Sequence, residues 1–159
     1  MVDRVRRNGT RTLVGGLIAL GLATSSWLAY SMAAPAGGTY PVTAAKVTGG
    51  GFIGTTKATR TSFGFEVQRK KDGTLKGKLQ VQMPGKHKFH GDTVSSLTVV
   101  GNTASWTGGG RFDGAPGFTF AVSVVDNSPD TFAITIKNPG NAVVFSASGP
   151  LAHGQIKIH

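Results

Sequence analysis

Four histidines are the residues of this sequence best suited to bind a transition metal. His87 and His90 lie three positions apart, so their rings would point to opposite faces of an extended strand and would chelate a metal poorly. His153 and His159 share the outward parity of the last expected strand. The chain has no cysteine, which excludes disulfides, thiol catalysis and cysteine-based zinc sites. We therefore expect exposed histidines, no metal site and no cofactor.

One short segment gathers the oxygen ligands that calcium prefers, from Asp126, Asn127 and Asp130. The same residue types are standard turn formers, and Asp-Asn-Ser-Pro bends without an ion. The segment also lacks the regular acidic spacing of a calcium-binding loop. We expect a turn here, with Asp126 and Asp130 as weak calcium candidates.

Few residues of the sequence are suited to catalysis. Glu66 is the only glutamate, whereas a glycosidase needs two facing carboxylates. After residue 33 the chain has no Gly-x-Ser-x-Gly or Ser-x-x-Lys motif that would supply an activated serine. The triglycine runs at 49–51 and 108–110 lack the Lys-Ser/Thr that follows in a phosphate-binding loop. The sequence predicts a protein that is not an enzyme.

Basic residues are the main remaining candidates for a binding site. Seven of them gather around one expected hairpin and the segment after it: Arg69, Lys70, Lys71, Lys76, Lys78, Lys86 and Lys88. Such a basic patch would attract an extracellular polyanion, an envelope polymer or anionic lipid. The alternative is a solvated hairpin whose lysines protect strand edges from aggregation. Nearly every phenylalanine has the inward parity, so outward aromatic rings for stacking on bases are not expected.

The N-terminal residues 1–33 have the pattern of an export signal. Four arginines precede an apolar run at 13–28, and Ser31-Met32-Ala33 places small residues at the −3 and −1 positions of a cleavage site. An uncleaved membrane anchor is the alternative. The chain has 17 basic and 7 acidic residues, of which residues 1–33 hold four basic residues and one acidic residue. The mature chain therefore keeps 13 basic and 6 acidic residues. We expect a basic protein that is secreted or held in the cell envelope.

Residues 34–42 form a Pro/Gly spacer, and residues 43–159 alternate polar and apolar side chains between turn signals, which is typical of one antiparallel all-β domain. The first hairpin can be given a register. A three-residue loop at 71–73, with Gly73 in the left-handed conformation, sets Phe65 opposite Leu79 and Phe63 opposite Val81 on the inner face. The same register sets Glu66 opposite a lysine, Lys78, on the outer face.

The following residues predict a meander of eight or nine strands. A two-residue Gly101-Asn102 turn sets Leu97 opposite Trp106, and the inward residues then continue through 118–124 and 132–136. The turn signal Gly149-Pro150 is expected to separate a strand at 143–147 from the last one at 155–158. A sheet with one apolar face cannot leave that face exposed to solvent, so the meander is expected to close into a barrel or to fold into a two-sheet sandwich. A barrel would bring residues 44–48 or residues 52–53 beside residues 156–158.

Three segments together resemble a type of secreted bacterial β-domain. They are Lys46-Val47-Thr48-Gly49-Gly50-Gly51, Phe63-Gly64-Phe65-Glu66-Val67-Gln68-Arg69 and Gly154-Gln155-Ile156-Lys157-Ile158-His159. The pattern is similar to that of the modules labelled post-COAP, which implies an exported accessory domain and no active-site residues. We expect a non-enzymatic structural or interaction module of the cell envelope or extracellular space. The alternative is a barrel that carries a small apolar ligand.

Overall fold

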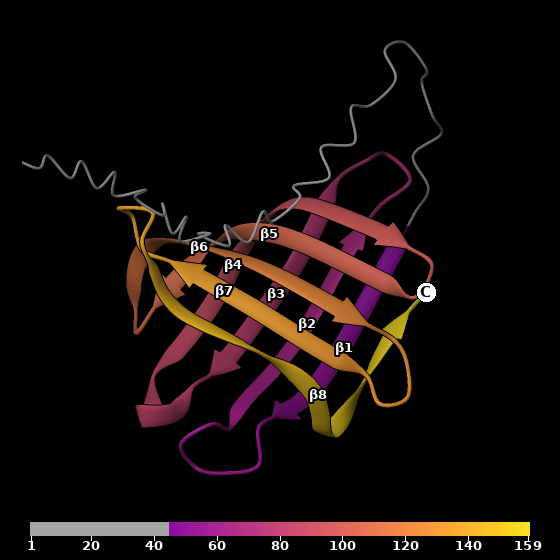
Figure 1. Ribbon diagram of the computed structural model, residues 1–159. Coiled ribbons are helices and arrows are strands. Elements are labelled where there is room, and N and C mark those ends of the chain that lie inside the picture. Colours follow the sequence, from indigo (N-terminus) through magenta and orange to yellow (C-terminus); the bar gives the residue numbers. More distant parts are fainter. Residues whose placement is uncertain (1–44) are drawn as a thin grey trace, which may run out of the picture. The chain divides into compact units, whose positions relative to one another are not determined.

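The computed structural model describes residues 45–159, so the expected export signal, the spacer and the first two residues of the expected domain lie outside the described part. These residues form eight antiparallel strands that close into a barrel in which consecutive strands are neighbours (Figure 1). The strands are β1 (Ala45–Ile53), β2 (Thr61–Arg69), β3 (Leu75–Gln82), β4 (Lys88–Val100), β5 (Thr103–Phe112), β6 (Ala115–Val125), β7 (Thr131–Lys137) and β8 (Val143–Ile158), with a short 3-10 turn, η1 (Pro84–Lys86), before β4. The all-β class and the closed barrel are therefore confirmed. Among the described residues, no helix has the length and apolar character that a membrane span requires.

The barrel closes through β8, which pairs with β7 in its first half and with β1 in its second half. Val47 lies opposite Ile158, so residues 44–48, the first of the two expected segments, lead into this pairing, which continues with Gly49 opposite Ile156. The prediction of two separate strands in this region is wrong, because β8 runs without a break from residue 143 to residue 158. Pro150 lies where β8 leaves β7 and joins β1, a position at which a missing N–H is tolerated.

Both predicted hairpin registers are confirmed. Phe65 lies opposite Leu79, and Gly73 has a φ of 84°, which is the left-handed conformation that the three-residue loop requires. In the second hairpin Leu97 lies opposite Trp106 across the Gly101-Asn102 turn. The sequence did not indicate the two register shifts between β4 and β5, which fall at residues 92 and 95.

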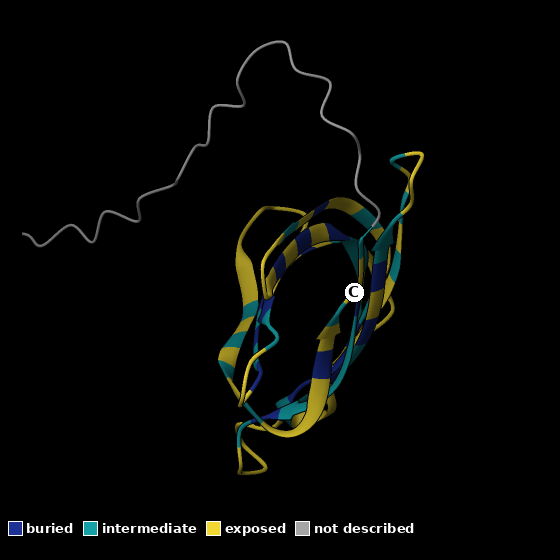
Figure 2. Cartoon of the chain, turned by 90° about the vertical axis from the view of Figure 1, so that its right-hand side faces the viewer, coloured by how far each residue is buried: buried dark blue, intermediate teal, exposed yellow. Residues whose placement is uncertain are grey.

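Aromatic side chains fill the centre of the barrel. The ring of Phe63 stacks on that of Phe132 with centroids 3.8 Å apart, and Phe65 contacts Trp106 at 4.7 Å. Buried and exposed residues alternate along the strands (Figure 2). Gly49 leaves room for this packing, because a Cβ atom at that position would lie 2.7 Å from Cζ of Phe65.

Candidate anion-binding site

The structure divides the predicted basic patch between the two ends of the barrel. The β2–β3 hairpin, with Lys70 and Lys71, lies at one end, whereas Lys86 and Lys88 follow the opposite end of β3 (Figure 1). Eight residues of strand separate these ends by about 26 Å. The residues of the predicted patch therefore extend along the length of β3 and do not gather at one hairpin.

Two residues of the predicted patch have different surroundings from those expected. Arg69 shares the inward parity of Phe65, is partly buried, and its Nη1 donates a hydrogen bond to the main-chain oxygen of Leu97 at 3.0 Å. Lys78 lies opposite Glu66 as predicted, but the ion pair of Glu66 is with Nζ of Lys46, at 2.9 Å. Lys76 and Lys78 project from the outer face of β3.

Lys86 and Lys88 contribute to a cleft that the sequence did not indicate. The cleft has a volume of about 780 Å³ and lies between the β1–β2 loop and the β3–β4 connection. Lys57 and Arg60 come from the β1–β2 loop, so four cationic side chains line one hollow. Ser62 and Gln82, which are opposite each other on β2 and β3, also line it, as do Met83, Pro84, Gly85 and His87. We call this hollow the basic cleft.

Local hydrogen bonds shape the β1–β2 side of the basic cleft. Gly54 has a φ of 77° and turns the chain at the end of β1. The main-chain oxygen of Thr56 then accepts hydrogen bonds from the N–H groups of Thr59 and Arg60, at 3.1 and 2.8 Å. The guanidinium of Arg60 lies 3.8 Å from the centroid of the Phe52 ring, a cation–π contact. This contact holds the charge of Arg60 beside the cleft.

Asp113 fixes the β3–β4 side of the cleft. Its Oδ1 accepts a hydrogen bond from the N–H of Lys88 at 2.8 Å, and its Oδ2 accepts one from Nδ1 of His87 at 2.6 Å. The hydrogen bond from His87 is the main reason that the pKa of Asp113 lies below its ordinary value. Lys86 belongs to the η1 turn with a φ of 69°. An extended segment would place Lys86, Lys88 and His90 on one face, but β4 begins only at Lys88, so Lys86 lies outside that strand.

The charge balance of the basic cleft favours an anionic ligand. Lys57, Arg60, Lys86 and Lys88 supply four positive charges, and all four residues are exposed. Asp113 is the acidic residue that contacts its lining, and that carboxylate is already hydrogen bonded to His87. Amine and guanidinium groups on two opposing sides can bind phosphate, sulfate or carboxylate oxygens together.

The other candidates from the sequence take structural positions. Oδ2 of Asp130 accepts a hydrogen bond from the N–H of Ile156 at 2.6 Å, and Oδ2 of Asp126 accepts one from the N–H of Ile158 at 3.1 Å. These carboxylates thus face main-chain donors of β8. Within residues 45–159 no three histidine or acidic side chains come together in a geometry that would hold a metal ion.

Comparison with protein-family models, curated proteins and solved structures gave no match to this chain. The resemblance to post-COAP modules therefore stays a prediction, and the geometry of the barrel and its clefts is the guide to its function.

Proposed function

We propose that this protein is an exported, non-enzymatic binding module of the cell envelope or extracellular space, and that it binds an anionic polymer through the basic cleft. The observation that carries the proposal is the convergence of Lys57, Arg60, Lys86 and Lys88, from two loops far apart in sequence, around one hollow of about 780 Å³. A polyanion would replace the mobile counterions of these four groups and gain affinity from their release.

The charge of the whole barrel supports a polymer as the ligand. Residues 45–159 carry 13 basic and 6 acidic side chains, so the surface potential would attract a long anion from any direction. Phe52 has an outward ring, but Arg60 covers it. This arrangement favours recognition of repeated anionic groups over stacking on nucleobases.

The packed interior supports a binding module over the alternative, a carrier of a small apolar ligand. Phe63, Phe65, Trp106 and Phe132 contact one another where such a ligand would lie. One observation favours the carrier: the buried hydroxyl of Thr61 has no hydrogen-bond partner, and it lines a hollow of about 340 Å³ at the end of the barrel. None of the four stacked aromatic residues lines that hollow, and its volume would admit only a small molecule.

The test is salt-dependent retention of the full-length protein on immobilised polyphosphate. We expect Lys57→Glu/Arg60→Glu and Lys86→Glu/Lys88→Glu each to elute at a markedly lower salt concentration than the wild type, because each removes two cations and adds two anions in the cleft. Lys137→Glu/Lys157→Glu makes the same change of net charge outside the cleft and is the matched control. Equal shifts for all three variants would show that only net charge matters, and the cleft would then be discarded as the site.

Export is a separate part of the proposal. N-terminal sequencing of the protein recovered from the extracellular and envelope fractions of its native host should give a chain that begins at Ala34. An intact N-terminus in the membrane fraction would instead support the anchor alternative.

A further inference from the structure

A second hollow lies on the surface of the barrel, at the other end of β3 from the basic cleft. It has a volume of about 620 Å³ and is lined by residues of β2, β3 and β4: Glu66, Gln68, Leu75, Lys76, Gly77, Lys78, Asp92, Thr93 and Val94. Val94 closes its floor, because a Cβ atom at Gly77 would lie 2.9 Å from Cγ2 of Val94. Of the described residues none lines both hollows, so any connection between them runs over the outer face of the strands.

The outward side chains of β3 connect the two hollows. They are Lys76, Lys78, Gln80 and Gln82, and all four are exposed. Lys76 and Lys78 line the second hollow, whereas Gln82 lines the basic cleft. Successive outward residues of a strand are about 6.6 Å apart, so these four span about 20 Å. None of them is acidic, and ammonium and amide N–H groups both donate hydrogen bonds to anions. We call these four residues the β3 row.

The surface beside the middle of the β3 row is free of side chains. Gln80 lies opposite Gly64 of β2, and Gly64 in turn lies opposite Gly50 of β1. A Cβ atom at Gly64 would meet no atom within 4 Å, so no side chain fills the space beside Gln80 on the β2 side. A linear ligand can therefore pass from one hollow to the other along the β3 row.

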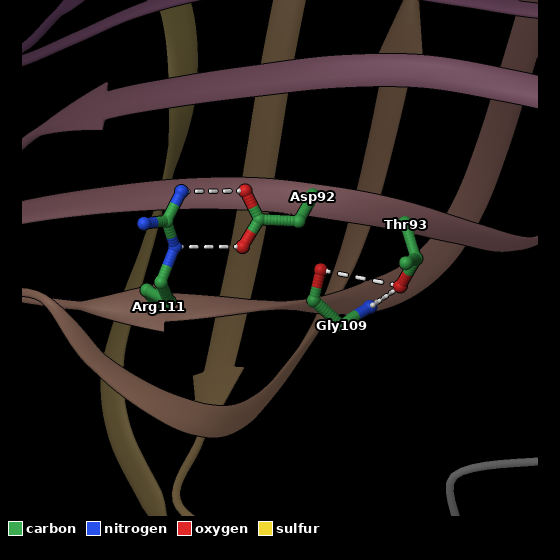
Figure 3. Close-up of polar contacts among 4 residues, drawn as sticks. All are labelled: Asp92, Thr93, Gly109 and Arg111. Carbon is green, nitrogen blue, oxygen red and sulfur yellow. Dashed lines mark hydrogen bonds and ion pairs between the residues drawn. The ribbon is translucent and has the colours of Figure 1, made fainter.

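The acidic residues of the second hollow are already paired. Figure 3 shows Nε and Nη2 of Arg111, which donate hydrogen bonds to the two carboxylate oxygens of Asp92 at 2.9 and 3.0 Å. The carboxylate of Glu66 forms an ion pair with Nζ of Lys46 at 2.9 Å. Within the described part of the chain, the two lysines of the β3 row form no ion pair. Their charges are therefore free to contact an anionic ligand.

We propose that the polyanion of the basic cleft is a linear chain that continues along the β3 row, so that one ligand molecule occupies both hollows. This inference rests on the proposed function and adds a minimum length, since the ligand must span the roughly 20 Å between Gln82 and Lys76. The cations of the cleft bind one part of the chain, and Lys76 and Lys78 bind another. Gln80 and Gln82 donate hydrogen bonds to the anionic groups between these parts. Binding at the first place raises the effective concentration of the chain at the second, an advantage that a short anion lacks.

The experiment compares a short and a long ligand on the full-length protein. Isothermal titration calorimetry at several salt concentrations gives the affinities for long-chain polyphosphate and for tripolyphosphate, which is too short to reach both hollows. The slope of log affinity against log salt concentration grows with the number of cationic contacts. Lys76→Gln/Lys78→Gln should reduce this slope by about 1–2 units for long-chain polyphosphate and leave it unchanged for tripolyphosphate.

The variant and its control are matched in charge. Glutamine already occupies the next two outward positions of β3, so Lys76→Gln/Lys78→Gln should keep the fold. Lys137→Gln/Lys157→Gln makes the same change of net charge, and neither residue lines either hollow. This control should leave both slopes close to those of the wild type.

A single substitution tests the surface between the hollows. Gln80→Glu replaces a donor with an anion in the middle of the β3 row. It should weaken long-chain polyphosphate about tenfold, through the lost hydrogen bond to a charged group, and leave tripolyphosphate unchanged. Gln155→Glu is the same substitution on β8, three strands away, and should have little effect on either ligand.

The outcomes separate this inference from the proposed function. If the variants of the β3 row behave like their controls with long-chain polyphosphate, the ligand does not follow β3, and the basic cleft stands alone as the site. Equal effects of Lys76→Gln/Lys78→Gln on both ligands would also overturn the inference, because the two lysines would then act only through the general field of the barrel. If the wild type binds neither ligand, the proposed function itself fails.

Discussion

Asp130 is the residue whose replacement should destabilise the barrel most clearly through a polar contact. The second half of β8 pairs with β1 only, so its other edge depends on side chains of the β6–β7 turn. Asp130 is 9% exposed. It accepts hydrogen bonds from the N–H of Ile156 at 2.6 Å and from the N–H of Asn127 at 2.8 Å. In Asp130→Ala the N–H of Ile156, a fully buried residue, loses its partner.

The size of the effect follows from these two bonds. A buried N–H left without a partner costs about 1–3 kcal/mol, and a hydrogen bond to a charged acceptor contributes about 1.5–3 kcal/mol. We therefore expect Asp130→Ala to lower the free energy of unfolding by about 2–4 kcal/mol, a large part of the roughly 5–15 kcal/mol of a typical domain. Urea denaturation followed by circular dichroism measures this difference.

Two further variants make the test specific. Asp130→Asn keeps one oxygen that can accept a hydrogen bond and should lose about half as much stability. Asp72 also accepts a main-chain hydrogen bond, from Thr74 at 2.9 Å, but it is exposed. Asp72→Ala should therefore cost much less stability than Asp130→Ala. If Asp130→Ala proves no less stable than Asp72→Ala, the carboxylate of Asp130 does not hold β8 through these hydrogen bonds.

Two other predictions follow from the core and from the cleft. Gly49→Ala should destabilise the barrel by about 1–3 kcal/mol through overpacking against Phe65, whereas Gly64→Ala, with no atom within 4 Å of the added Cβ, should change urea stability far less. The hydrogen bond from His87 lowers the pKa of Asp113 in the folded protein. This contact therefore stabilises the fold at pH values above the ordinary carboxyl pKa of 3.8. The stabilisation is lost as the pH falls through the lowered pKa of the folded state. Urea midpoints of the wild type and Asp113→Asn should thus converge in acid, and a constant difference would contradict the assignment.

Local pattern was sufficient to predict most of the strands and the registers of two hairpins. Inward residues such as Phe65 and Leu79 alternate with polar ones, and a one-residue slip would have moved them all to solvent. The turn at Gly73 then selected one register. The same alternation places Arg69 on the inner face, but it could not identify the hydrogen-bond partner of Arg69, because the oxygen of Leu97 is 28 residues away in sequence.

Long-range geometry explains what the sequence could not show about the site. Lys57 and Arg60 line the same cleft as Lys86 and Lys88 only because the β1–β2 and the β3–β4 connections lie at the same end of a closed barrel. An antiparallel meander always places alternate connections at the same end, and that topological signal was available in the predicted strand order. The distance between two such loops, by contrast, depends on strand tilt and loop conformation.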